Sequence, residues 1–258
     1  MKKIIHISLD AMGGDNAPEI VVEGAFQSKV RHPNLAFSFF GDKSKLLPLI
    51  DNREILKDSN IIHTKEIVDS NEKPSIAVRK GKKTSMGMSI QLVQSGEADA
   101  IVSAGNTGAL MAMSKLYLRP IEGISRPAIV AYFPTVSGES CMLDLGANIE
   151  CDSKNLVQFA FMGQAFARIV MGIKNPSISL LNIGEEEQKG LDYIKEASKI
   201  LSNLSKKINY TGFIEGDKIA QGYSDVIIAD GFSGNVSLKT AEGTAQLVTF
   251  YLKKALSS

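Results

Sequence analysis

The sequence has 258 residues, with 29 Lys and Arg against 28 Asp and Glu, a formal net charge of +1, and 44% hydrophobic residues. These values are average for a soluble globular protein, and they exclude a disordered tail, a collagen-like fibre and a disulfide-stapled mini-protein. The near-neutral charge argues against a nucleic-acid partner. Cys141 and Cys151 have no metal-site or redox spacing. We therefore expect free thiols in a reducing, cytoplasmic compartment.

Short β-branched runs alternate with longer amphipathic segments along nearly the whole chain. In order, the pattern predicts strand 4–9, helix 19–30, strand 35–40, helix 76–95, strand 100–103, helix 107–118, strand 128–133, strand 141–145, helix 153–171, strand 178–182, helix 191–206, strand 208–213, strand 226–229 and helix 236–256. Such alternation is typical of an α/β protein with a mostly parallel sheet covered by helices. No repeat or linker marks a boundary, so we treat residues 1–258 as a single α/β catalytic domain.

Five of the predicted strands end in glycine-containing polar loops that lead toward a helix. These loops cover residues 10–16, 103–108, 144–148, 182–187 and 230–235. In a parallel sheet such loops emerge at the carboxyl ends of the strands, where open α/β proteins bind ligands. We therefore predict that the five loops converge on one cleft.

The composition of these loops suits a small anion. Glycine allows close approach of backbone N–H groups, and each following helix adds unpaired donors and the positive end of its dipole. The residues we assign to phosphate or substrate binding are Gly13, Gly14, Asp15, Asn16, Ser103, Gly105, Asn106, Thr107, Gly184, Glu185, Asp230, Ser233 and Gly234. For any single loop, turn formation and helix capping remain the alternative explanation.

Acidic residues in and beside the loops have two interpretations. The run 185–187 complements a helix dipole better than it would bind a cation, and we assign no metal ligands. Asp10, Asp15, Asp144 and Asp230 sit at or just beyond strand ends. They either hold the loops by hydrogen bonds or repel the wrong anion, and position alone does not decide between these roles.

A basic segment precedes the methionine-rich part of the helix predicted at 76–95. It contains Arg79, Lys80, Lys82 and Lys83 within five residues. Such a cluster either steers an acidic partner protein toward the site or is a solvated helix end.

The loop sequences also carry a family resemblance. They read DAMGGD at 10–15, SAGNTGA at 103–109, RP at 126–127, DLGAN at 144–148, NIGEE at 182–186, DGFSGNV at 230–236, LKT at 238–240 and EG at 242–243. With these motifs the chain resembles the bacterial phosphate acyltransferases of phospholipid synthesis. The resemblance implies a three-layer α/β/α, Rossmann-like fold related to the isocitrate and isopropylmalate dehydrogenase architecture.

The resemblance also implies an activity. Enzymes of this family transfer a fatty acyl group from acyl carrier protein to inorganic phosphate and use no cofactor. On this basis we expect Lys239, one turn into its helix, and the amides of Asn235 and Asn148 to be catalytic, and the basic segment to bind the acidic carrier protein.

The family further implies a homodimer, peripheral association with the inner face of the membrane, and delivery of acyl phosphate to a membrane glycerol-3-phosphate acyltransferase. Its members continue through a further strand and helix beyond the position of Ser258, so we expect this chain to lack that C-terminal segment.

Three alternatives remain open. The first is a phosphotransacetylase-like enzyme that uses coenzyme A in place of the carrier protein. The second is a metal-dependent hydroxyacid dehydrogenase of the isopropylmalate type. The third is a truncated, non-catalytic form that binds carrier protein or membrane.

Overall fold

The computed structural model describes residues 3–257, and contacts divide the chain into two compact units, Met1–Pro120 and Ile121–Ser258. Each unit is built around its own sheet. No signal in the sequence predicts a boundary at Pro120. The prediction of one catalytic domain stays a prediction, because two compact units can still form one catalytic domain.

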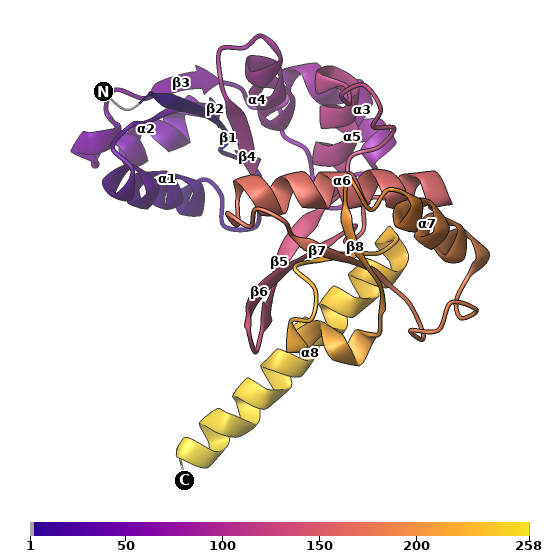
Figure 1. Ribbon diagram of the computed structural model, residues 1–258. Helices are drawn as coiled ribbons and strands as arrows, with labels where there is room; N and C mark the ends of the chain where they lie inside the picture. The colour runs from indigo at the N-terminus through magenta and orange to yellow at the C-terminus, as the bar shows by residue number, and fades with distance from the viewer. Residues whose placement is uncertain (1–2, 258) are drawn as a thin grey trace. The chain divides into compact units, whose positions relative to one another are not determined.

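The first unit contains a four-stranded parallel sheet in the order β3-β2-β1-β4. Its elements are β1 (Ile5–Asp10), α1 (Glu19–Arg31), β2 (Leu35–Gly41), α2 (Lys43–Asp51), β3 (Asn60–His63), α3 (Pro74–Lys80), α4 (Ser85–Gln94), β4 (Ala100–Ser103) and α5 (Thr107–Leu118). Short 3-10 turns occupy Glu54–Leu56 and Gly81–Lys83. The adjacent β1 and β4 place the first two glycine loops beside each other (Figure 1).

Helices cover both faces of this sheet. Leu9, Phe37 and Phe39 point to one face and pack with Val22 of α1 and Leu46 of α2. The opposite face contacts α4, which packs against α5, and α5 packs in turn against α3. Alternate residues of each strand therefore reach separate hydrophobic cores, as the period of two in a strand requires.

The second unit contains a five-stranded sheet in the order β5-β6-β9-β7-β8, parallel except for the β5–β6 hairpin. Its elements are β5 (Val130–Thr135), β6 (Gly138–Leu143), α6 (Ser153–Ile169), β7 (Ser177–Leu181), α7 (Asp192–Asn203), β8 (Asn209–Ile214), the 3-10 helix Gly216–Gln221, β9 (Val226–Ile228) and α8 (Gly231–Leu256). The three central strands β6, β9 and β7 lead into the other three glycine loops.

Layers also form on both faces of the second sheet. Leu156 and Phe159 of α6 and Leu201 of α7 pack on Leu180 and its neighbours on one face. On the other face, the 3-10 helix and Leu238 of α8 pack around Phe133 and Ile227. From Ala241 to Ser257, however, every residue of the α8 region is exposed.

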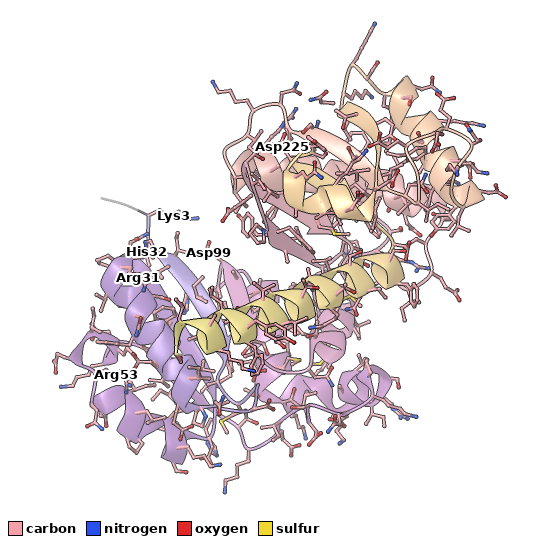
Figure 2. All side chains as sticks on the ribbon, turned by 90° about the horizontal axis from the view of Figure 1, so that it is seen from below. Lys3, Arg31, His32, Arg53, Asp99 and Asp225 are labelled. Carbon is pink, nitrogen blue, oxygen red and sulfur yellow. The ribbon has the colours of Figure 1, made fainter. Side chains whose placement is uncertain are left out.

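Aspartates at the amino edges of the two sheets fix the strand starts. Asp99, just before β4, accepts the backbone N–H of His6 at 2.8 Å and pairs with Lys3 at 3.5 Å. Asp225, just before β9, accepts both the N–H and the hydroxyl of Ser177 at 2.7 Å. Figure 2 labels Asp99, Lys3 and Asp225. Each carboxylate thus sets the register of two neighbouring parallel strands.

The α/β fold with mostly parallel sheets is confirmed, and the predicted ranges for β4 and α5 are correct to the residue. The four largest differences are these. Helix α2, which contains Pro48, and the four-residue β3 were missed, and the predicted helix 76–95 is two helices divided at Gly81–Lys83. Helix α8 begins at Gly231 instead of residue 236.

No helix within residues 3–257 combines the length and the apolar character needed to cross a bilayer.

Candidate functional site

The two glycine loops of the first unit are in direct contact. The hydroxyl of Ser103, at the end of β4, donates to Oδ2 of Asp10, at the end of β1, at 2.7 Å. A Cβ atom on Gly13 would lie 2.5 Å from that same Oδ2 and 2.9 Å from the nitrogen of Gly105. Glycine is therefore required where the two loops cross.

Asn106 fastens the start of α5. Its Oδ1 caps the N–H of Ala109 at 2.9 Å, and its Nδ2 donates to the carbonyl oxygens of Asp69, Ser70 and Glu72. The side chain of Asn106, which we assigned to phosphate binding, therefore already makes its hydrogen bonds within the protein. Among the described residues no hydrogen bond takes the N–H groups of Thr107 and Gly108, as expected for the first turn of a helix.

Asp10 is a buried carboxyl, only 1% exposed. Its Oδ1 has no hydrogen-bond partner among the described residues. Desolvation raises the pKa of Asp10 above its usual 3.8, although donors including Ser85 and Ser103 oppose the shift. The Asp10 carboxyl holds the two loops through the Ser103 hydrogen bond, and its burial disfavours the charged form.

An apolar groove of about 440 Å³ lies beside Asp10, between α1 and strands β1, β2 and β4. Its walls are mostly apolar side chains: Ile7, Leu9, Ile20, Val21, Leu35, Phe37 and Val102. Asp10, Ser103 and Ala104 also line the groove. The groove and the two glycine loops therefore share residues.

Asp144 holds the loop that follows β6 in the second unit. It is fully buried and accepts hydrogen bonds from the N–H groups of Ile129, Ala147 and Asn148 and from Nδ2 of Asn148. The Asn148 amide also donates to the carbonyl of Pro127 at 2.8 Å. The amide that we assigned to catalysis is therefore part of the loop's internal bonding.

Asp230 holds the start of α8 in the same way. Its Oδ1 accepts the N–H of Ser233 at 2.9 Å, and its Oδ2 accepts the hydroxyls of Ser233 at 2.8 Å and Tyr193 at 3.0 Å. A Cβ on Gly234 would lie 1.9 Å from the carbonyl oxygen of Asp144. The loops after β6 and β9 therefore pack backbone to backbone.

The third loop of this unit, after β7, is held by Asn182, whose Nδ2 donates to the carbonyls of Gly184 and Lys189 at 3.1 Å. Glu185 pairs with Lys218 at 2.5 Å. Within residues 3–257 no three acidic, histidine or cysteine side chains gather as metal ligands would.

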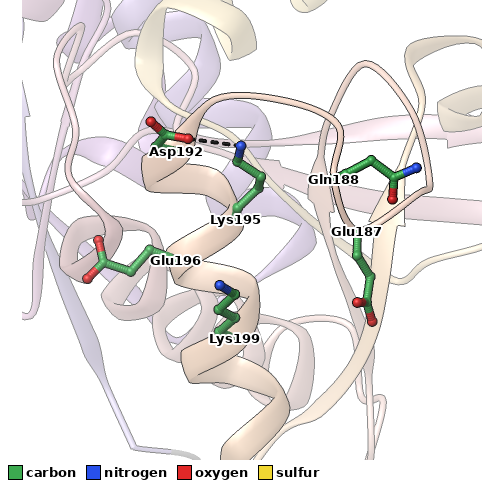
Figure 3. Close-up of a pocket in the computed structure, with 6 residues that line it drawn as sticks. All are labelled: Glu187, Gln188, Asp192, Lys195, Glu196 and Lys199. Carbon is green, nitrogen blue, oxygen red and sulfur yellow. Dashed lines mark ion pairs between the residues drawn. The ribbon is translucent and has the colours of Figure 1, made fainter.

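A surface groove of about 620 Å³ lies between this loop and α7 (Figure 3). Its lining contains three carboxylates and two lysines: Glu187, Asp192, Glu196, Lys195 and Lys199, with Gln188. Asp192 and Lys195 form an ion pair at 2.9 Å. The excess of carboxylates makes this groove a poor site for phosphate.

Lys239 lies farther into its helix than predicted. It is the ninth residue of α8, about 12 Å along the axis at about 1.5 Å per residue, and it pairs with Glu242 at 2.8 Å. The expected position one turn into the helix was wrong because the helix starts five residues earlier. Asn235, also on α8, donates to the carbonyl of Leu145 at 3.1 Å.

The basic segment forms the end of α3 and the 3-10 turn that follows it. Lys80 pairs with Glu72 at 2.6 Å, whereas Arg79, Lys82 and Lys83 are exposed without a side-chain partner among the described residues. Three of the four predicted cations are thus available to a partner.

The two cysteines are free, as expected. Burial raises the pKa of the Cys141 thiol to about 12 and that of Cys151 to about 11. Both therefore remain protonated near neutral pH.

The structure brings the predicted loops together in two sets, one in each unit. The set in the first unit is 10–16 with 103–108, and the set in the second is 144–148 with 230–235, joined to α7 through Tyr193. The single five-loop cleft stays a prediction. Sequence reasoning missed Tyr193, which carries no local motif, and the buried role of Asp10.

The fold is similar to that of solved phosphotransacylases. A phosphotransacetylase from Staphylococcus aureus superposes with a TM-score of 0.68 at 20% identity, covering 94% of this chain and 82% of the other. A branched-chain phosphotransacylase from Enterococcus faecalis gives a TM-score of 0.59 at 16% identity, with 92% and 83% covered. The fold is therefore that of the phosphotransacylase class.

Sequence comparison identifies the family. A family model described as "Fatty acid synthesis protein" matches residues 5–258. Proteins named phosphate acyltransferase from Rhodospirillum centenum and Paramagnetospirillum magneticum are 51% and 50% identical over 100% of this chain, which spans 73% and 74% of their lengths. The chain belongs to the phosphate acyltransferase family, a family of acyltransferases.

We expect Gly234→Ala to destabilise the protein by about 1–3 kcal/mol, the usual cost of forcing extra volume into a packed site. The added Cβ would meet the Asp144 carbonyl. The matched control is Gly243→Ala, where a Cβ meets no heavy atom within 4 Å and the helix gains up to about 1 kcal/mol. Urea unfolding measures both. Equal stabilities would contradict the close packing of the two loops.

We expect Asp10→Asn to change the pH dependence of stability. Because the native pKa of Asp10 lies above 3.8, its contribution is complete below that pH and is lost as the pH rises through the native pKa. The unfolding free energy of the wild type relative to Asp10→Asn should therefore fall on going from about pH 3.5 to 7, by at most about 1.4 kcal/mol per pH unit. A pH-independent difference in urea unfolding would rule out the raised pKa.

Proposed function

We propose that this chain transfers a fatty acyl group from acyl carrier protein to inorganic phosphate and releases an acyl phosphate for phospholipid synthesis. The proposal rests on membership of the phosphate acyltransferase family together with one structural observation. The first turn of α5, beside the crossed glycine loops, presents the N–H groups of Thr107 and Gly108, which no hydrogen bond within residues 3–257 takes. Backbone donors at a helix N-terminus favour an anion such as phosphate.

The reaction needs little acid–base help from the protein. A phosphate oxygen forms a bond to the thioester carbonyl carbon, and the electron pair of the carbon–sulfur bond leaves with sulfur, which takes up a proton as the thiol. Phosphate is largely ionised near pH 7, and a thiol has a pKa of about 8.5. The protein must chiefly align the reactants and stabilise the tetrahedral oxyanion.

Two surfaces suit the acyl donor. The apolar groove beside Asp10 fits a hydrocarbon chain next to the glycine loops. The exposed cations Arg79, Lys82 and Lys83 fit an acidic carrier protein, since opposite charges speed encounter. We propose that this basic segment receives the carrier protein.

We also propose that the chain acts in the cytoplasm as a homodimer at the membrane surface and hands acyl phosphate to a membrane glycerol-3-phosphate acyltransferase. Support comes from the exposed apolar side chains of α8, which include Leu247, Val248, Phe250 and Leu252. Burying such side chains against a second protein chain or a lipid surface removes apolar area from water.

The second candidate function is acyl transfer between coenzyme A and phosphate. It is favoured by the shared fold with the Staphylococcus aureus phosphotransacetylase. The two candidates differ in the thiol carrier and not in the chemistry.

The test is to incubate the chain with palmitoyl carrier protein, with or without phosphate, and to measure the free carrier thiol and the acyl phosphate. We expect phosphate-dependent release of thiol with palmitoyl carrier protein at a higher kcat/KM than with palmitoyl coenzyme A. Preference for coenzyme A would favour the second candidate, and no phosphate-dependent product would contradict both.

The variant Lys82→Glu/Lys83→Glu tests the carrier surface in the same assay. Reversing two exposed charges should lower kcat/KM for the carrier thioester by about tenfold or more through a slower encounter, and leave a small thioester unaffected. Lys206→Glu/Lys207→Glu, on exposed residues of the second unit, is the matched control. Equal losses for both thioesters would remove the basic segment from carrier binding.

A further inference from the structure

Ser233 and Tyr193 share one acceptor. Ser233 is in the first turn of α8 and Tyr193 in the first turn of α7, and both hydroxyls donate to Oδ2 of Asp230. Asp230 is 5% exposed, and its carboxylate accepts from these two hydroxyls and from the N–H of Ser233. The three donors come from two helices that follow neighbouring strands, β7 and β9.

The Ser233 hydroxyl is not free to bind substrate in this arrangement. A hydroxyl has one proton, and that of Ser233 points at Asp230, so only lone pairs remain for another group. To donate to an oxyanion, the side chain must rotate and leave Oδ2. A buried carboxylate oxygen that loses its donor costs more than an ordinary hydrogen bond contributes.

Tyr193 removes that cost. Its hydroxyl donates to Oδ2 at 3.0 Å and would stay there if Ser233 turned away, while Oδ1 would keep the Ser233 N–H. Burial and the negative charge of Asp230 both raise the pKa of Tyr193, so the phenol keeps its proton and stays a donor. Its O–H dipole also offsets the repulsion between Asp230 and an incoming anion.

We propose that Tyr193 is a positioning residue that holds Asp230 and thereby frees the Ser233 hydroxyl to donate to an oxyanion of the acyl transfer. This inference rests on the proposed function and adds to it a residue that touches no substrate. Ser233 makes the contact, and Tyr193 decides whether Ser233 is available. Without the tyrosine hydroxyl, Ser233 leaves Asp230 less readily and the site loses part of the contribution of the serine.

A double-mutant cycle tests the proposal with palmitoyl carrier protein and phosphate. We expect Ser233→Ala to lower kcat/KM about tenfold to a hundredfold, the range for a hydrogen bond to a charged group. We expect Tyr193→Phe to lower it several-fold, mainly in kcat, and to have no further effect in the Ser233→Ala background. A merely structural role would give losses that multiply.

Tyr210→Phe is the matched control. It removes a tyrosine hydroxyl from the same unit, one that donates to Ser198 at 2.8 Å. It should leave kcat/KM within twofold, and cooperative thermal unfolding of both variants checks that each is folded.

The outcomes separate the inference from the proposed function. Multiplicative losses, or a Tyr193→Phe enzyme as active as the wild type, would overturn the inference and leave the proposed function standing. Full activity of Ser233→Ala would do the same. A wild-type chain with no phosphate-dependent transfer would overturn both.

Discussion

The arrangement of the loops depends on buried aspartates at the carboxyl ends of parallel strands. Asp10, Asp144 and Asp230 each end a strand or lie within two residues of its end, are at most 5% exposed, and accept hydrogen bonds from the loops beside them. A buried carboxylate is stable only where such donors surround it. For these three residues the structure shows the first of the two roles left open by the sequence, because they hold the loops.

The same bonding determines which donors remain for a ligand. The N–H groups of Gly105, Asn148 and Ser233 are taken by Ser103, Asp144 and Asp230. Those of Thr107 and Gly108 are not taken within residues 3–257. The first turn of α5 therefore keeps two N–H groups that no hydrogen bond within residues 3–257 takes, which supports the proposed anion site there.

Much of the fold could be predicted because its signals are local. Helix α5 has an Asn106 cap and an uninterrupted helical run, and its predicted bounds were correct. Helix α2 was missed because a proline inside a helix is unfavourable, and Pro48 is the sixth of the nine residues of this helix. The break at Gly81 was missed because it depends on a distant contact, since a Cβ there would meet Tyr117.

The site was less predictable for the same reason. The motif residues were found. The sequence does not show, however, that the side-chain amides of Asn106 and Asn148 donate hydrogen bonds to a loop carbonyl and a carboxylate. Tyr193 reaches Asp230 across 37 positions and has no motif of its own. Hydrogen bonds between distant segments decide which polar groups face a ligand, and those bonds exist only once the sheets have formed.

The most direct test of the central claim is a titration of the ¹⁵N-labelled protein with inorganic phosphate, followed through the backbone amide resonances. We predict saturable shifts that are largest at Thr107, Gly108 and the neighbouring Gly14, with little change at Gly243 on the exposed part of α8. Shifts confined to surface lysines, or none at these three amides, would contradict an anion site at the loops that the buried aspartates hold.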